Sequence, residues 1–89
     1  MEIGDVFDAN WFRMEDVEDV VSDYVEAAAT LGYREVRILH GKRTGDRRLR
    51  VRAALSTHPV VLRFADAPKT RGGLGGTLVW LTGTKVPPK

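Results

Sequence analysis

The sequence contains no cysteine and only two histidines, His40 and His58, among its 89 residues. Without cysteine there is neither a disulfide framework nor a thiolate metal site, and two histidines fall short of the four Cys or His ligands typical of structural zinc. No apolar run approaches the roughly 20 residues of a membrane span. The acidic N-terminal segment also lacks the basic start of a secretory signal. We therefore expect a cytoplasmic protein without a membrane partner.

The length allows one small domain, predicted to cover residues 1–82 with a C-terminal tail at 83–89. Charge is unevenly distributed along this domain. Residues 1–31 carry nine acids and one base, a net charge of −8, whereas residues 32–89 carry thirteen bases and three acids, a net charge of +10. Either the fold presents a basic face to an anionic partner, or the charges interleave and cancel. Both interpretations stay open at this point.

The clearest predicted element is a helix in MEDVEDVVSDYVEAAATLG, ending near Gly32. Its apolar residues recur at the spacing of one helical face. They are Val17, Val20, Val21, Tyr24, Val25 and Ala28. A second helix is predicted over Asp46–Thr57, with Asp46 as its N-cap and a buried stripe of Val51, Ala54 and Leu55. Short β-branched runs predict four strands, at Val6–Ala9, Glu35–His40, Val60–Ala65 and Thr77–Thr82. The predicted order is β-α-β-α-β-β.

The segment between the second strand and the second helix reads His40-Gly41-Lys42-Arg43-Thr44-Gly45. Glycines let a backbone turn sharply and bring its N–H groups toward a ligand. The helix that follows points its positive dipole end at the same place. The pattern favours phosphate binding, with a plain β-α turn as the alternative. The candidate nucleic-acid-binding residues here are Gly41, Lys42, Arg43, Thr44, Gly45, Arg47 and Arg48, and Lys69 and Arg71 in the glycine-rich connection before the last strand extend the set.

The run EVRILHGKRTG…LRVRAALSTHPVVLRFADAP…GGLGGTLVWL resembles the Smr (small MutS-related) domain family. That family shows a strand ending in His-Gly, a glycine-rich loop, a helix followed by His-Pro, and two further strands. The resemblance implies an α/β two-layer sandwich, with two helices packed on a four-stranded mixed sheet. It also implies binding of DNA or RNA, endonuclease activity in some members, and a possible place in larger nucleic-acid-processing or ribosome-associated machinery.

Two positions depart from the family pattern. Arg43 stands where the family usually has the middle glycine of the loop, and a side chain at positive φ costs roughly 1 kcal/mol or more. The family's LDLHG motif corresponds to FDANW here, so that Asp8 keeps the motif's Asp while Asn10 replaces its His and Trp11 its Gly. Because that motif is tied to cleavage in active members, the change counts against nuclease activity.

His40 and Asp8 are the candidate catalytic residues. A histidine beside a phosphate-binding loop can exchange a proton near neutral pH, but His40 can equally hydrogen-bond the backbone and shape the loop. Asp8 either orients His40, holds a metal ion, or caps the first helix or lines its start. Trp11 and Phe12 are expected to lie in the core or form a hydrophobic staple, with base stacking as the alternative.

Three classes of function follow. The first is a nucleic-acid-binding module, the second an endonuclease using His40 and Asp8, and the third a protein-interaction domain docking through its acidic helix or an edge strand. The basic residues around 42–48 favour the first class. No cofactor is expected, with a divalent cation as the open alternative.

Overall fold

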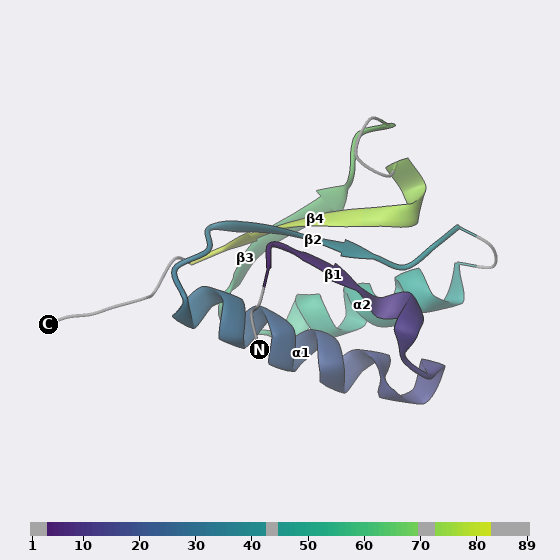
Figure 1. Ribbon diagram of the computed structural model, residues 1–89, viewed down its shortest axis with the longest axis horizontal. Coiled ribbons are helices and arrows are strands. Elements are labelled where there is room, and N and C mark those ends of the chain that lie inside the picture. Colours follow the sequence, from purple (N-terminus) through teal and green to yellow (C-terminus); the bar gives the residue numbers. More distant parts are fainter. Residues whose placement is uncertain (1–3, 43–44, 70–72, 83–89) are drawn as a thin grey trace, which may run out of the picture.

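The computed structural model of the protein describes residues 4–42, 45–69 and 73–82, which form one sheet and two helices (Figure 1). The elements in chain order are β1 (Val6–Asp8), the 3-10 turns η1 (Ala9–Trp11) and η2 (Met14–Asp16), α1 (Val17–Thr30), β2 (Glu35–Leu39), α2 (Asp46–Thr57), β3 (Val61–Asp66), the 3-10 turn η4 (Gly73–Gly75) and β4 (Gly76–Leu81). The predicted order β-α-β-α-β-β is confirmed. The expected tail at 83–89 lies outside the described residues.

The four strands form a mixed sheet in the order β1-β2-β4-β3. β1 and β2 pair in parallel, which requires a crossover, and α1 provides it. β4 pairs antiparallel with both β2 and β3. Both helices cover the same face of the sheet, so the predicted two-layer α/β arrangement is confirmed (Figure 1).

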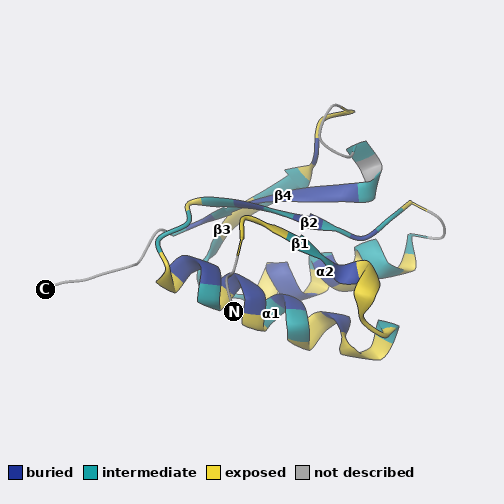
Figure 2. Ribbon diagram, in the orientation of Figure 1, coloured by how far each residue is buried: buried dark blue, intermediate teal, exposed yellow. Residues whose placement is uncertain are grey.

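The core lies between the helices and this covered face (Figure 2). Strand side chains alternate between faces, and Val36, Ile38 and Val79 on the covered side are almost completely buried. The predicted stripe of α2 is buried in full, and that of α1 is buried apart from Val20, which is half-buried. Helical periodicity therefore identified the faces that pack on the sheet.

Several predicted element boundaries differ from the observed ones by one residue. The N-cap of α2 is Gly45, which adopts the left-handed conformation with φ of 82°, and Asp46 is already the first helical residue. β3 begins at Val61 rather than Val60, because the Val60 N–H donates to Nδ1 of His58 in the turn that ends α2. The last strand is also shifted by one residue, to Gly76–Leu81. In the described part of the chain, neither helix is both long and apolar enough to cross a membrane.

Candidate nucleic-acid interface

Three connections meet at one end of the sheet: the turn after β1, the loop after β2, and η4 before β4 (Figure 1). The N–H groups of His40 and Gly41 both donate to the carbonyl oxygen of Gly75, at 2.9 and 3.1 Å. The Lys42 side chain lies over Gly75. A Cβ placed on Gly75 would be 3.3 Å from Cγ of Lys42. His40, Gly41 and Lys42 of the predicted HGKRTG segment therefore lie at this junction, and Gly45 directly precedes α2.

The expectation that the Gly41 N–H faces a ligand is wrong, because Gly75 already accepts its hydrogen bond. A different constraint explains the glycine. Its φ is 78°, in the left-handed region, and a Cβ there would meet Oδ1 of Asn10 at 3.3 Å. Gly41 thus allows the turn after β1 to approach the loop after β2.

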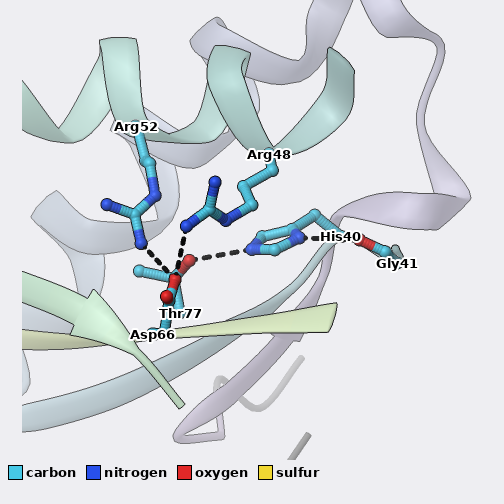
Figure 3. A network of polar contacts seen from close by, with 6 residues as sticks. All are labelled: His40, Gly41, Arg48, Arg52, Asp66 and Thr77. Carbon is cyan, nitrogen blue, oxygen red and sulfur yellow. Dashed lines mark hydrogen bonds and ion pairs between the residues drawn. The ribbon is translucent and has the colours of Figure 1, made fainter. Parts of the chain in front are cut away.

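His40 is buried, with 3% of its surface exposed, and both ring nitrogens have partners (Figure 3). Nδ1 lies 3.0 Å from the Gly41 carbonyl oxygen, which can only accept, so Nδ1 carries the proton and donates. In the neutral ring Nε2 is then the acceptor for the Thr77 hydroxyl, 2.8 Å away. The expected hydrogen bond between His40 and the loop backbone is confirmed.

The environment of His40 favours its neutral form. Burial lowers the pKa of the imidazole below its usual 6.5, and the positive charges of Arg48 and Arg52 lower it further. The hydrogen bond to Gly41 and the charge of Asp66 act in the opposite direction. A neutral imidazole with both nitrogens engaged shapes the loop, and it has to break one of these bonds before it can exchange a proton with a ligand.

Asp8 does not orient His40. Its Oδ1 accepts a hydrogen bond of 2.9 Å from the Asn10 N–H and so caps the short 3-10 turn η1, whereas the sequence had offered the first helix as the element that Asp8 caps. The expected Asp8–His40 pair is therefore not formed. In the described part of the chain, no group of three or more His, Asp or Glu side chains comes together in a way that suits a metal ion.

Two of the predicted phosphate-binding arginines are engaged within the protein. Nη1 of Arg47 donates to the carbonyl oxygens of Ala9 and Phe12, at 3.1 and 2.6 Å, and so fastens the turn after β1 to the start of α2. Nη2 of Arg48 lies 2.6 Å from Oδ1 of Asp66, and the hydrogen bonds from Arg48 hold the pKa of that carboxyl below its usual value.

Arg52, one helical turn after Arg48, contacts the same Asp66 oxygen at 2.5 Å (Figure 3). Sequence reasoning missed this cluster. The available signal was an i, i+4 arginine pair on the second predicted helix and an acid directly after the third predicted strand. One carboxylate thus neutralises part of the positive charge that the sequence assigned to a ligand.

The remaining candidate binding residues differ in exposure and in position. Lys42 and Lys69 are exposed, and Lys69 lies in the connection that leads to η4. Gly45 supplies the turn into α2. Arg43, Thr44 and Arg71 lie outside the described residues.

The expectation that Trp11 is buried is wrong, because 83% of its surface is exposed. Phe12 follows the expectation more closely, since its ring stacks on Phe7 with centroids 5.4 Å apart, and Phe7 stacks in turn on Tyr24. The turn after β1 therefore packs one aromatic ring inward and directs the other to solvent.

Comparison with known proteins gives consistent results. Residues 8–82 match the family described as the Smr domain. The chain is 38% identical over 79 residues to a protein of Solidesulfovibrio magneticus named endonuclease MutS2, an alignment that covers 89% of this chain and 10% of that protein. The chain thus spans about a tenth of the length of the curated relatives it matches.

Two solved structures share the fold. The Smr domain of Thermus thermophilus MutS2 superposes with a TM-score of 0.81 at 37% identity, over 88% of this chain and 98% of that domain. YdaL, a stand-alone small MutS-related protein of Escherichia coli, superposes with a TM-score of 0.73 at 25% identity, over 86% of this chain and 63% of the other.

Proposed function

This chain belongs to the Smr domain family, and on that basis we propose that it binds the phosphate backbone of nucleic acid at the end of the sheet where three connections meet. The observation that carries the proposal is the position of the exposed Lys42 beside the N-terminus of α2. A lysine and the positive end of a helix dipole both attract phosphate. Lys69 extends the basic surface along the β3–β4 connection.

Two of the arginines proposed to bind phosphate already have hydrogen-bond partners within the protein. Arg47 and Arg48 are committed to Ala9, Phe12 and Asp66, so Lys42 is the principal cation among the described residues of the loop. Arg47 acts as a positioning residue that fixes the turn after β1. A ligand that draws Arg48 away from Asp66 has to replace a charge-assisted hydrogen bond with a comparable one.

The salt dependence of binding tests this proposal. Fluorescence anisotropy with labelled DNA should show log K falling against log salt, with a slope of roughly −1 to −3 for one to three phosphate contacts. Lys42→Ala should weaken binding to every sequence and reduce the slope by about one. The matched control is Arg34→Ala, which removes an exposed positive charge just before β2, at the opposite end of that strand. A flat salt dependence, or equal effects of the two variants, would falsify the proposal.

A second candidate function is endonuclease activity, which the name of the related MutS2 proteins favours. The side chains at the junction favour it less. His40 is buried and hydrogen-bonded at both nitrogens, and Asn10, which replaces the family histidine, cannot exchange a proton near neutral pH. We therefore infer that the protein binds nucleic acid with little or no cleavage.

Asn10→His tests that inference. The Asn10 side chain lies against Gly41, so a histidine at this position enters the same junction. General acid–base catalysis is typically worth 10²–10⁴-fold, and we expect nicking of supercoiled plasmid to rise by up to about a hundredfold without a gain in affinity. The assay is run with Mg²⁺, with Mn²⁺ and with EDTA. Efficient nicking by the unmodified protein that His40→Gln abolishes would place the protein among the enzymes.

A further inference from the structure

Trp11 is the most exposed of the large hydrophobic residues that the structure describes, with 83% of its surface accessible. Tryptophan carries a large apolar ring and is highly buried on average in folded proteins. Of the two residues beside it in the chain, Asn10 is polar and exposed, whereas the Phe12 ring is 37% exposed and stacks on Phe7. Trp11 therefore presents one freely exposed aromatic ring, because its aromatic neighbour is engaged with Phe7, and a single ring suits the stacking of one flat partner.

The backbone that carries Trp11 is held in place from several directions. Asp8 caps the turn at its start, and Ala9 is completely buried beneath it. Arg47 donates to the carbonyl oxygens of Ala9 and Phe12, which flank Asn10 and Trp11. A ring on a fixed turn loses less conformational freedom on binding than a ring on a mobile loop.

This turn also lies next to the proposed phosphate-binding end of the sheet. Asn10, the residue before Trp11, meets Gly41, and Lys42 follows directly in the chain. Proteins that bind single-stranded nucleic acid combine basic side chains along the backbone with aromatic rings on which bases stack. Trp11 and Lys42 supply one of each at neighbouring positions.

We propose that Trp11 stacks on an unpaired nucleobase, and that the protein consequently prefers single-stranded DNA or RNA to a fully paired duplex. This inference rests on the proposed function, because the phosphate contact places the strand. In a duplex the flat faces of the bases are covered by their neighbours, so the ring gains a partner only where a base is unpaired. An unpaired base is common to single-stranded DNA and RNA, and stacking does not distinguish them.

The test compares three labelled probes of equal length: an oligothymidylate, an oligouridylate and a mixed-sequence duplex DNA. Trp11→Ala should weaken binding to the two single strands by roughly five- to a hundredfold, the range expected for loss of one stacked base, and change duplex binding less than about twofold. Trp11→Phe should restore most of the affinity because it keeps a stacking ring. Leu62→Ala is the matched control, since Leu62 is an exposed apolar residue on β3, at the other edge of the sheet.

Fluorescence supplies a second readout that does not depend on affinity. The chain has two tryptophans, so Trp80→Phe leaves Trp11 as the sole reporter. We expect its emission to be quenched by the oligothymidylate and not by the duplex, with an unchanged melting temperature showing that the variant folds. Quenching of equal size by both probes, or single-strand affinity unaffected by Trp11→Ala, would overturn the inference.

These outcomes separate the two proposals. If Lys42→Ala weakens binding to all three probes and Trp11→Ala weakens none, phosphate binding stands and base stacking falls. If no probe binds in a salt-dependent manner, both proposals fall.

Discussion

At the scale of single residues, the burial of His40 affects the stability of the protein as well as proton exchange with a ligand. Its ring joins the Gly41 carbonyl to the Thr77 hydroxyl and so connects the end of β2 with the start of β4. Protonating the ring converts Nε2 from an acceptor to a donor and adds a charge near Arg48 and Arg52. The hydrogen bond with Thr77 then has to reverse its direction, so folding and protonation of this histidine oppose each other.

We therefore expect the free energy of unfolding to decrease as the pH is lowered. Because the folded-state pKa of His40 lies below its usual 6.5, the unfolded chain binds the proton more tightly. The contribution of the neutral ring is fully present above pH 6.5 and is lost as pH falls from there toward the lowered folded-state value. Urea unfolding between about pH 8 and about pH 5 measures the effect.

The comparison is with His40→Gln, which should be less stable overall and show a flatter pH dependence. His58→Gln serves as the control, because it removes the other histidine of the chain, at the end of α2. Parallel pH curves for the wild type and His40→Gln would contradict the expectation. The usual pKa of 3.8 for Asp66 keeps that group out of this pH range, since its folded-state pKa is lower still.

Residue-scale predictions from the sequence were the least accurate, for a physical reason. Thr77, one of the two partners of His40, lies 37 positions away in the chain, and the partners of Arg47 lie 35 and 38 positions away, so no local pattern encodes these contacts. The hydrophobicity of Trp11 suggested burial, whereas its ring is exposed on a turn whose carbonyl oxygens bind the distant Arg47. The fold was predictable to the extent that it follows from periodicity, whereas the polar contacts of the site were not.

At the scale of elements, one carboxylate links the end of β3 to two arginines of α2. Arg48 and Arg52 point from α2 to the same oxygen of Asp66, and Arg52 also lies over the Phe64 ring, 5.2 Å from its centroid. The Nε atoms of both arginines are buried without a hydrogen-bond partner among the described residues. Asp66 therefore offsets two guanidinium groups that the helix holds close together.

Asp66→Asn should destabilise the protein by about 1 kcal/mol. An exposed ion pair contributes little, and this carboxylate is 41% exposed, but sharing between two arginines raises its effect toward that of a charge-assisted hydrogen bond. Asp23→Asn in the middle of α1 removes one exposed negative charge as the control. Chemical denaturation gives both values, and equal stability of the two variants would show that the cluster contributes only net charge.

The two helices were predicted nearly to their observed bounds because both carry a clear apolar stripe. The predicted C-terminal end of α2 near Thr57 agrees with the observed end, whereas the helix begins one residue earlier than predicted, because Asp46 is its first residue and Gly45 its cap. Apolar runs identify a strand without marking where pairing stops, so strand ends shifted by about one residue. The sheet order β1-β2-β4-β3 was not predicted, because the family resemblance implied only that the sheet is mixed. The sequence of a short strand does not show which strands pair with it.

At the scale of the whole molecule, the uneven charge of the sequence is partly resolved in space. The acidic residues of α1, including Glu18, Asp19 and Asp23, are exposed on the helical layer, whereas Lys42 and Lys69 are exposed on connections at strand ends. A polyanion is thus repelled from α1 and attracted to the end of the sheet. The charge of the basic half is also reduced from within, because Asp66 pairs with two of its arginines.

The two edge strands of the sheet, β1 and β3, affect whether copies of the chain pair edge to edge in concentrated solution. β1 contributes three paired residues to one edge, and β3 at the other edge has an irregular register between Val61 and Arg63. Short or bulged strands are poor templates for strand addition, and such edges protect a sheet from edge-to-edge aggregation. The same irregularity weakens the case for a protein partner that docks by extending the sheet. The short β1 and the irregular β3 at the sheet edges therefore disfavour amyloid-like polymerisation of the domain.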